Sequence, residues 1–272
     1  MVTAPLRDII KRYDLGARKS LGQHFLLDRN LCARIARAAG DLGGVNVIEI
    51  GPGPGGLTRA LLDTDARAVV AVETDHRCVE ALGELCTEHP GRLTIIEADA
   101  LDTDVTTLAP APRRIVANLP YNVSTPLLLG WLGQINEFDG LTLMFQKEVA
   151  ERLAAAPGNK NYGRLSIITQ WLCDVRFEFN VSKQAFTPPP KVASSIVTLT
   201  PRVQPLAPAD RKTLEAVTAM AFGQRRKMLR SSLKTLNLDF ASLDIAPTAR
   251  AEELSIEQFC AIANTIPMKA TG

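Results

Sequence analysis

The chain has 272 residues, of which 31 are Lys or Arg, 29 are Asp or Glu and 46% are hydrophobic. This length allows one large domain or two ordinary ones, and the apolar content with nearly balanced charge excludes a wholly disordered chain. No apolar run approaches the ~20 residues that span a bilayer, which excludes a transmembrane protein.

The five cysteines are scattered, form no CxxC pair and do not cluster with any of the three histidines. A metal site is therefore not expected, and the cysteines indicate free thiols in a reducing compartment. The first 20 residues hold no apolar core of the kind found in signal peptides, and Asp8 and Asp14 argue against a transit peptide. We expect a cytoplasmic protein.

Short apolar runs alternate with helical patterns between residues 45 and 146. The expected strands are Val45–Ile50, Ala68–Glu73, Leu93–Glu97, Arg114–Asn118 and Leu141–Phe145. Runs that are apolar on both faces are typical of parallel strands covered by helices on both sides. The helical patterns between them at Leu57–Leu62, Arg77–Cys86 and Thr125–Leu132 suit crossover helices. The pattern predicts a doubly wound, Rossmann-like α/β sheet.

Two helical stretches and two further strand-like runs follow, and the runs flank a loop that holds three consecutive prolines. The helices are expected at Lys147–Ala155 and Leu165–Trp171, and the strands at Val175–Val181 and Ser194–Thr200. The segment Pro201–Pro208 has three prolines and no periodicity, so it is interpreted as a linker. Residues 209–235 and 248–264 have helical patterns. We therefore predict an α/β domain over 1–202 and a small all-helical domain over 203–272.

The first expected strand runs into a glycine-rich turn, Gly51-Pro52-Gly53-Pro54-Gly55-Gly56. Such a turn between strand and helix lets a ligand approach the backbone closely. Its spacing also fits a nicotinamide enzyme, but the two prolines remove backbone N–H donors that a pyrophosphate would need. The anion of Glu49 favours a ligand with a positive centre and no phosphate. S-adenosylmethionine has these properties, with Glu73 placed for its ribose and Asp99 for its adenine amine.

The tetrapeptide Asn118-Leu119-Pro120-Tyr121 follows the fourth expected strand, at the edge where such sheets bind ligands. An exocyclic adenine amine is a poor nucleophile because its lone pair is delocalised into the ring. The Asn118 side chain and the carbonyl of Leu119 or Pro120 would accept its two hydrogens and direct the lone pair at the methyl donor. Tyr121 offers a ring on which the base would stack, which is worth ~1–3 kcal/mol.

These motifs, taken together, resemble the ribosomal RNA adenine dimethyltransferase family. The matching strings are Lys19–Leu26, Glu49–Gly56, Asn118–Tyr121, Gln146–Ala150, Asn161–Ser166, Phe186–Ser194 and Ala221–Ser231. They cover about residues 7–235, and the similarity is greatest to the bacterial small-subunit branch, whose loss gives kasugamycin resistance. The resemblance implies dimethylation of two adjacent adenosines in the 3′-terminal hairpin of 16S rRNA, with S-adenosylmethionine as methyl donor and a role in small-subunit biogenesis.

The resemblance also implies which residues form the site. The expected cofactor contacts are His24, Leu26, Gly51, Glu73, Asp99 and Asn118. His24 departs from the family pattern, which usually has Asn there. Phe186 is implied to pack on the face of the target base opposite Tyr121, and the rigidity of Pro188–Pro190 supports that role. The alternative is a core phenylalanine beside a proline turn.

The basic residues of the C-terminal part are candidates for RNA binding. Arg225, Arg226, Lys227 and Arg230 lie close together with no acid among them, and helical spacing would put several on one face. The alternative is an ordinary solvated face. The expected partner is the small ribosomal subunit, bound by a monomer and with no role for a membrane.

Other functions remain open at this point. A large-subunit rRNA methyltransferase shares the fold and the tetrapeptide, although the proline loop and the basic segment favour the small-subunit branch. A DNA adenine methyltransferase has a similar tetrapeptide, but the chain has no sizeable insert for reading DNA sequence. An assembly checkpoint factor would occupy immature subunits, with methylation secondary.

Overall fold

The computed structural model describes residues 5–18, 21–224 and 227–267. It divides into two compact units, of which the first comprises Met1–Ala150 with Arg176–Pro201 and the second Glu151–Val175 with Arg202–Gly272. The chain leaves the first unit at Pro201, beside the boundary expected at residue 202. The segment Glu151–Val175, expected in the α/β domain, instead groups with the C-terminal helices.

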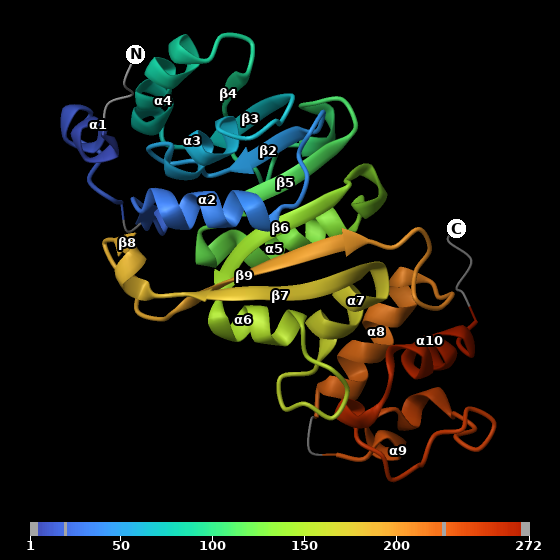
Figure 1. Cartoon of the computed structure of the whole chain (residues 1–272). Coiled ribbons are helices and arrows are strands. Elements are labelled where there is room, and N and C mark those ends of the chain that lie inside the picture. The colour runs from blue at the N-terminus through green and yellow to red at the C-terminus, as the bar shows by residue number, and fades with distance from the viewer. Residues whose placement is uncertain (1–4, 19–20, 225–226, 268–272) are drawn as a thin grey trace. The chain divides into compact units, whose positions relative to one another are not determined.

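The first unit contains a seven-stranded sheet with the order β4-β3-β2-β5-β6-β9-β7 (Figure 1). Its strands are β2 (Asn46–Ile50), β3 (Ala68–Glu73), β4 (Leu93–Glu97), β5 (Arg113–Asn118), β6 (Gly140–Gln146), β7 (Cys173–Val181) and β9 (Ser194–Pro201). The first five pair in parallel, and β9 runs antiparallel to β6. From β2 the chain adds β3 and β4 on one side and then returns to add β5 and β6 on the other side of β2. The order of strands therefore switches between β2 and β5, and their carboxyl ends flank the crevice where doubly wound sheets bind ligands.

Helices connect the parallel strands as the apolar pattern predicts. They are α3 (Gly56–Leu62), α4 (His76–Glu88) and α5 (Tyr121–Leu132), with α6 (Lys147–Leu153) after β6. Each expected strand and crossover helix of this part is present, with β3 and β4 at the expected bounds and the other ends shifted by at most four residues. The largest shift is in α5, which begins at Tyr121 because Pro120 precedes the helix and cannot continue it backwards.

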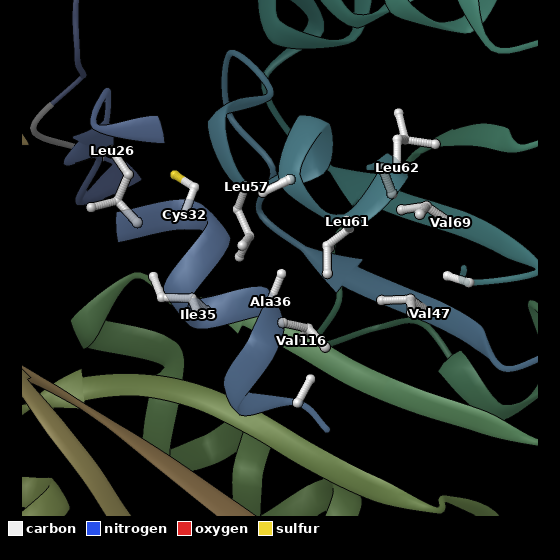
Figure 2. Packing of buried hydrophobic residues seen from close by; sticks show 14 of the residues in the cluster. Leu26, Cys32, Ile35, Ala36, Val47, Leu57, Leu61, Leu62, Val69 and Val116 are labelled. Carbon is white, nitrogen blue, oxygen red and sulfur yellow. The ribbon is translucent and has the colours of Figure 1, made fainter. Parts of the chain in front are cut away.

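The helix α2 (Arg29–Ala38) precedes β2 and covers one face of the sheet together with α3. Cys32, Ile35 and Ala36 of α2 belong to one buried apolar cluster with Leu57 and Leu61 of α3, and Figure 2 shows Ala36 directed toward these two leucines. Asp28 caps the helix by accepting from the backbone N–H groups of the first turn. Complete burial of a leucine such as Leu61 is worth about 1.5–3 kcal/mol. Because α3 begins at the last glycine of the turn, the packing of this helix also holds the turn against the sheet.

The N-terminal arm is the segment that precedes α2. It contains α1 (Leu6–Arg12) and the two-residue strand β1 (Phe25–Leu26), which pairs antiparallel with β8 (Phe186–Thr187). Arg12 and Tyr13 both donate to Glu84 of α4. The β1–β8 pair joins segments about 160 residues apart, a contact that no local sequence pattern predicts.

The second unit is helical, with α7 (Arg164–Leu172), α8 (Arg211–Phe222), α9 (Leu229–Ser232) and α10 (Ile256–Asn264). The rings of Tyr162 and Phe259 both pack on Phe222, at centroid distances of 6.2 and 5.8 Å. The segment from 151 to 175 therefore completes a core that the short C-terminal helices alone would leave open.

A continuous helix over 209–235 is wrong. The helix α8 ends at Phe222, because Gly223 is a poor helix former, and the chain then bends at Lys227. Met228 forms an isolated bridge with Arg250, which fixes an extended backbone before α9 begins. The pattern over 248–264 likewise becomes a helix only from Ile256, where Ser255 caps it.

Candidate active site

The glycine turn after β2 is shaped by close contacts with its surroundings. Gly51, Gly53 and Gly55 all have positive φ. The N–H of Gly53 donates to Glu73 over 2.9 Å, and a Cβ on Gly53 would lie 3.1 Å from the Phe25 ring. A Cβ on Gly56 would lie 2.3 Å from the carbonyl oxygen of Leu26, closer than any side chain allows. The turn thus depends on glycine to pass beneath β1.

Two buried carboxyl groups lie beneath this turn. Glu73 accepts from the N–H groups of Gly53, Thr74 and Asp75 at 2.8–2.9 Å, and burial nevertheless raises its pKa. Glu49 is 1% exposed, and its Oε2 has no hydrogen-bond partner in the part of the chain that the structure describes. Burial raises the pKa of Glu49 to about 8, although the neighbouring Thr58 side chain acts to lower it, and the charge of Glu73 adds to the rise. The turn therefore covers a carboxyl group that a cation would stabilise in its ionised form.

The tetrapeptide after β5 lies at the same edge of the sheet. Asn118 donates from Nδ2 to the carbonyl oxygen of His24 over 3.2 Å, which leaves Oδ1 as the acceptor of this side chain. Leu119 is buried, and Pro120 places Tyr121 at the first position of α5. The Tyr121 hydroxyl is 2.5 Å from Oγ of Ser194 at the start of β9, so the ring orientation is fixed from across the sheet.

The N-terminal arm is fastened to this edge by a polar network that sequence reasoning missed. Asp75 caps α4, is 2% exposed and accepts from Gln23 and Arg77 over 3.0 and 2.8 Å. The bonds from Arg77 hold the pKa of Asp75 down at about 2. Arg77 also donates to the carbonyl oxygens of Asp14 and Gly16. Gln23 belongs to one of the strings that resemble the family, which marks it as a candidate. No local pattern predicts its hydrogen bond to Asp75, 52 residues away.

The proline loop follows β8 and contains a cis bond between Thr187 and Pro188. Phe186 is 3% exposed and packs in the apolar cluster with Leu26, Cys32 and Ile35. The ring of His24 lies against Phe186 in an edge contact, with 6.5 Å between centroids, and His24 Nδ1 is 2.8 Å from the carbonyl oxygen of Pro188.

These elements enclose a cavity of about 210 Å³. Of the predicted residues, it is lined by His24, Leu26, Gly51, Glu73, Asp99, Asn118, Leu119, Pro120 and Tyr121. Phe186 is not part of the lining. Unpredicted lining residues include Gln23, Leu57, Ala100, Asn122 and Leu127. Asp99 is exposed at the rim, where its carboxylate accepts from the Leu101 N–H over 2.9 Å.

The predicted RNA-binding residues belong to the second unit. Arg225 and Arg226 lie outside the described residues. Lys227 is exposed in the bend after α8, and Arg230 is exposed on α9. A single helical face shared by Lys227 and Arg230 is wrong, because Lys227 lies in a bend before α9 begins at Leu229.

Two further findings concern metals and membranes. Across residues 5–18, 21–224 and 227–267, no group of three or more His, Cys, Asp or Glu residues is arranged to hold a metal ion. Within the same ranges, no helix combines the length and apolarity that a membrane crossing requires.

Comparison with known proteins identifies the family. The model of the ribosomal RNA adenine dimethylase family matches residues 15–267. "Ribosomal RNA small subunit methyltransferase A" of Paramagnetospirillum magneticum is 62% identical over 265 residues, covering 96% of this chain and 94% of that protein. The protein of the same name from Rhodospirillum rubrum is 60% identical, covering 96% of this chain and 92% of that protein.

Solved structures show the same fold. A dimethyladenosine transferase from Plasmodium falciparum superposes with a TM-score of 0.77 at 28% identity, covering 88% of this chain and 96% of that one. The 23S rRNA methyltransferase ErmE superposes with a TM-score of 0.71, also at 28% identity, covering 89% of this chain and 98% of that one. The chain belongs to the ribosomal RNA adenine dimethylase family of Rossmann-like methyltransferases, enzymes that take their methyl groups from S-adenosylmethionine.

Proposed function

We propose that this chain dimethylates the exocyclic amines of two adjacent adenosines in the 3′-terminal hairpin of 16S rRNA during small-subunit biogenesis. The observation that carries the proposal is the arrangement at one sheet edge of an acceptor amide, Asn118, beside a glycine turn over buried carboxyl groups. The names of the relatives at 54–62% identity favour the small subunit over the large one.

The residues that line the cavity suit S-adenosylmethionine. The unpartnered oxygen of Glu49 beneath the turn fits a cofactor with a sulfonium and an ammonium group. Glu73 Oε2 accepts a single backbone hydrogen bond and retains capacity for a ribose hydroxyl. Asp99 would accept from the adenine amine, and Gly51, Leu26 and His24 would contact the cofactor along the turn and the arm. The bound cofactor supplies an electrophilic methyl group.

Asn118 prepares the acceptor amine. Its Oδ1 and the carbonyl oxygen of Leu119 or Pro120 accept the two amine hydrogens, which localises the nitrogen lone pair and directs it into the cavity. The bond from Asn118 Nδ2 to His24 holds the amide in this orientation before any base arrives. The contribution is positioning and electrostatics. No general base is needed, because the nitrogen becomes cationic as it gains the methyl group and then loses one proton to water.

Tyr121 and Phe186 would hold the base after it leaves its stack, which costs least in a hairpin loop. Arg225, Arg226, Lys227 and Arg230 would bind the RNA backbone, with Lys227 and Arg230 as separate contacts and not as one helical face. Such contacts make binding to the subunit steeply dependent on salt. We propose a monomer acting in the cytoplasm.

The test is methyl transfer from labelled S-adenosylmethionine to small subunits that lack the modification, followed by mass spectrometry of the digested rRNA. Dimethyladenosine that maps to the 3′-terminal hairpin is the expected product. Asn118→Ala should lower transfer by roughly 10²–10³-fold, as loss of one preorganised polar contact does, while the variant still binds subunits. Methylation of large subunits alone would contradict the proposal. If Asn118→Ala restored growth to a strain lacking the gene, the binding role would be the one that matters.

A further inference from the structure

His24 contacts both of the aromatic residues assigned to the target base. Its ring is 5.9 Å from the Tyr121 ring and 6.5 Å from the Phe186 ring, centroid to centroid. His24 and Tyr121 both line the cavity, whereas Phe186 does not. The ring of His24 is thus the surface that the cavity presents on the side where Phe186 lies.

Two hydrogen bonds hold His24 in this place. Nδ1 donates to the carbonyl oxygen of Pro188 over 2.8 Å, since a carbonyl only accepts, and the backbone oxygen of His24 accepts from Asn118. The side chain is therefore tied to the proline loop and the backbone to the residue that orients the acceptor amine. The backbone bond can persist while the ring turns away, because rotation about χ1 moves the side chain alone.

We propose that the ring of His24 is a placeholder in the base-binding slot, which must swing away from Phe186 before the target adenine can stack there. It stabilises the empty slot by covering Phe186 and tying down the proline loop. Entry of the base exchanges this ring for the adenine. His24 is in this sense a positioning residue, and the inference rests on the proposed function.

Two substitutions separate the ring from its hydrogen bond. His24→Phe keeps an aromatic ring that packs on Phe186, and exposing this apolar ring to water costs more free energy than exposing an imidazole. His24→Asn, the residue usual in the family, empties the slot and retains a donor. Both leave the backbone oxygen that accepts from Asn118 in place. Kinetics with unmethylated small subunits and calorimetric titration with S-adenosylmethionine are measured for each.

We expect His24→Phe to lose roughly tenfold in kcat, the equivalent of one weakened base stack, with KM for the subunit unchanged because docking precedes base entry. His24→Asn should keep kcat within about threefold of the native value at saturating S-adenosylmethionine, where a change in the cofactor contact of His24 alters affinity and not kcat. A native kcat for His24→Phe at saturating cofactor, or an equal loss of kcat in His24→Asn, would overturn the placeholder role. Failure of the proposed function is distinguishable, because the native chain itself would then not methylate small subunits.

A second, independent observation concerns the outer face of α2. Arg29, Arg34 and Arg37 are exposed, fall within about 140° around the helix and have no acid among the residues of α2. None of the three forms an ion pair within the described ranges of the chain. The guanidinium of Arg34 lies 3.7 Å from the centre of the Phe179 ring, and Arg29 is close enough to Arg59 to help burial lower the pKa of that residue.

We infer that this face binds the rRNA backbone beside the target hairpin. Positive charge gathered on one helix face, with no ion pair to neutralise these three side chains, fits phosphates, and guanidinium groups suit them because of their planar fork of donors. The amino end of this face, Arg29, lies three residues after β1, and β1 pairs with β8, which precedes the proline loop. This end of the face therefore lies beside the segments proposed to admit the base. It supplies the first unit with an RNA contact separate from the basic segment of the second unit, and it too rests on the proposed function.

The test is the salt dependence of binding to small subunits. Replacing Arg29, Arg34 and Arg37 with Ser should make the slope of log K against log salt shallower by about two, since each phosphate contact contributes roughly 0.7–0.9. A single Arg34→Ser variant is compared with Arg67→Ser as its control, because Arg67 is exposed next to the amino end of β3, at the edge of the sheet opposite the cavity. An unchanged slope would overturn the inference. So would weaker binding that does not depend on salt, which would indicate a protein partner instead.

Discussion

The two halves of the cavity are built by different means. The half proposed for the cofactor consists of backbone and buried carboxyl groups at the ends of adjacent parallel strands, where Gly53 donates to Glu73 and Glu49 lies beneath the turn. The half proposed for the base is lined by the rings of His24 and Tyr121, which two side-chain hydrogen bonds hold, and Phe186 packs against His24 outside the lining. The first half is fixed by the sheet, whereas the second depends on a few contacts that substrate binding can exchange.

The largest effect is expected where the halves meet. Gly56→Ala places a methyl group 2.3 Å from the Leu26 carbonyl oxygen, so the turn or β1 must move. We expect a loss of roughly 3 kcal/mol in the free energy of unfolding, measured in urea, together with weaker cofactor binding. Gly83→Ala within α4 is the matched control, because nothing lies within 4 Å of its Cβ and the helix should gain up to about 1 kcal/mol. Equal stability of the two variants would contradict this account of the turn.

The attachment of the arm is the next test. The folded pKa of Asp75 is about 2, below its ordinary value of about 3.9, so its stabilisation is present above about pH 4 and is lost as pH falls toward 2. Asp75→Asn should therefore cost about 2 kcal/mol near neutral pH, and the difference from the native protein should shrink near pH 3. Urea unfolding at both pH values measures this. A difference that does not change with pH would show that the charge of Asp75 is not what holds the arm.

Cofactor binding should release a proton from the first half. The pKa of Glu49 is raised to about 8, so its carboxyl group is mostly protonated near pH 7 and destabilises the fold as pH rises toward 8. A bound cation favours the ionised form, and up to one proton per site should leave. Calorimetry in buffers of different ionisation enthalpy counts it. S-adenosylhomocysteine, which lacks the sulfonium, should release less, and Glu49→Gln should abolish the effect. Equal release by Glu49→Gln would point to another group.

The smallest effect is expected in the second half. Tyr121→Phe keeps the ring and loses the bond to Ser194, which is worth about 1 kcal/mol, so kcat/KM should fall roughly fivefold. Ser194→Ala should cause the same loss, and the double variant should lose no more than either single one. Additive losses in the double variant would mean that the two residues act separately.

The sequence alone predicted the parallel strands of the sheet and the glycine turn that follows the first of them. Apolar runs from Val45 to Phe145 predict strands because a strand buried on both faces must be apolar throughout, and this signal is local. The motif Asn118–Tyr121 and the turn were placed correctly at one sheet edge for the same reason, since parallel strands bring their carboxyl ends together. The resemblance to the family came from the same local strings.

Only the tertiary structure decided the contacts between distant segments. The pairing of β1 with β8, the bond from Gln23 to Asp75 and the position of His24 over Phe186 join residues 52 to about 160 positions apart. The interruption after Phe222 was missed because a bridge from Met228 to Arg250 overrides the helical pattern. Local propensities amount to less than about 1 kcal/mol per residue, so contacts of this kind determine where elements end and which side chains share a site.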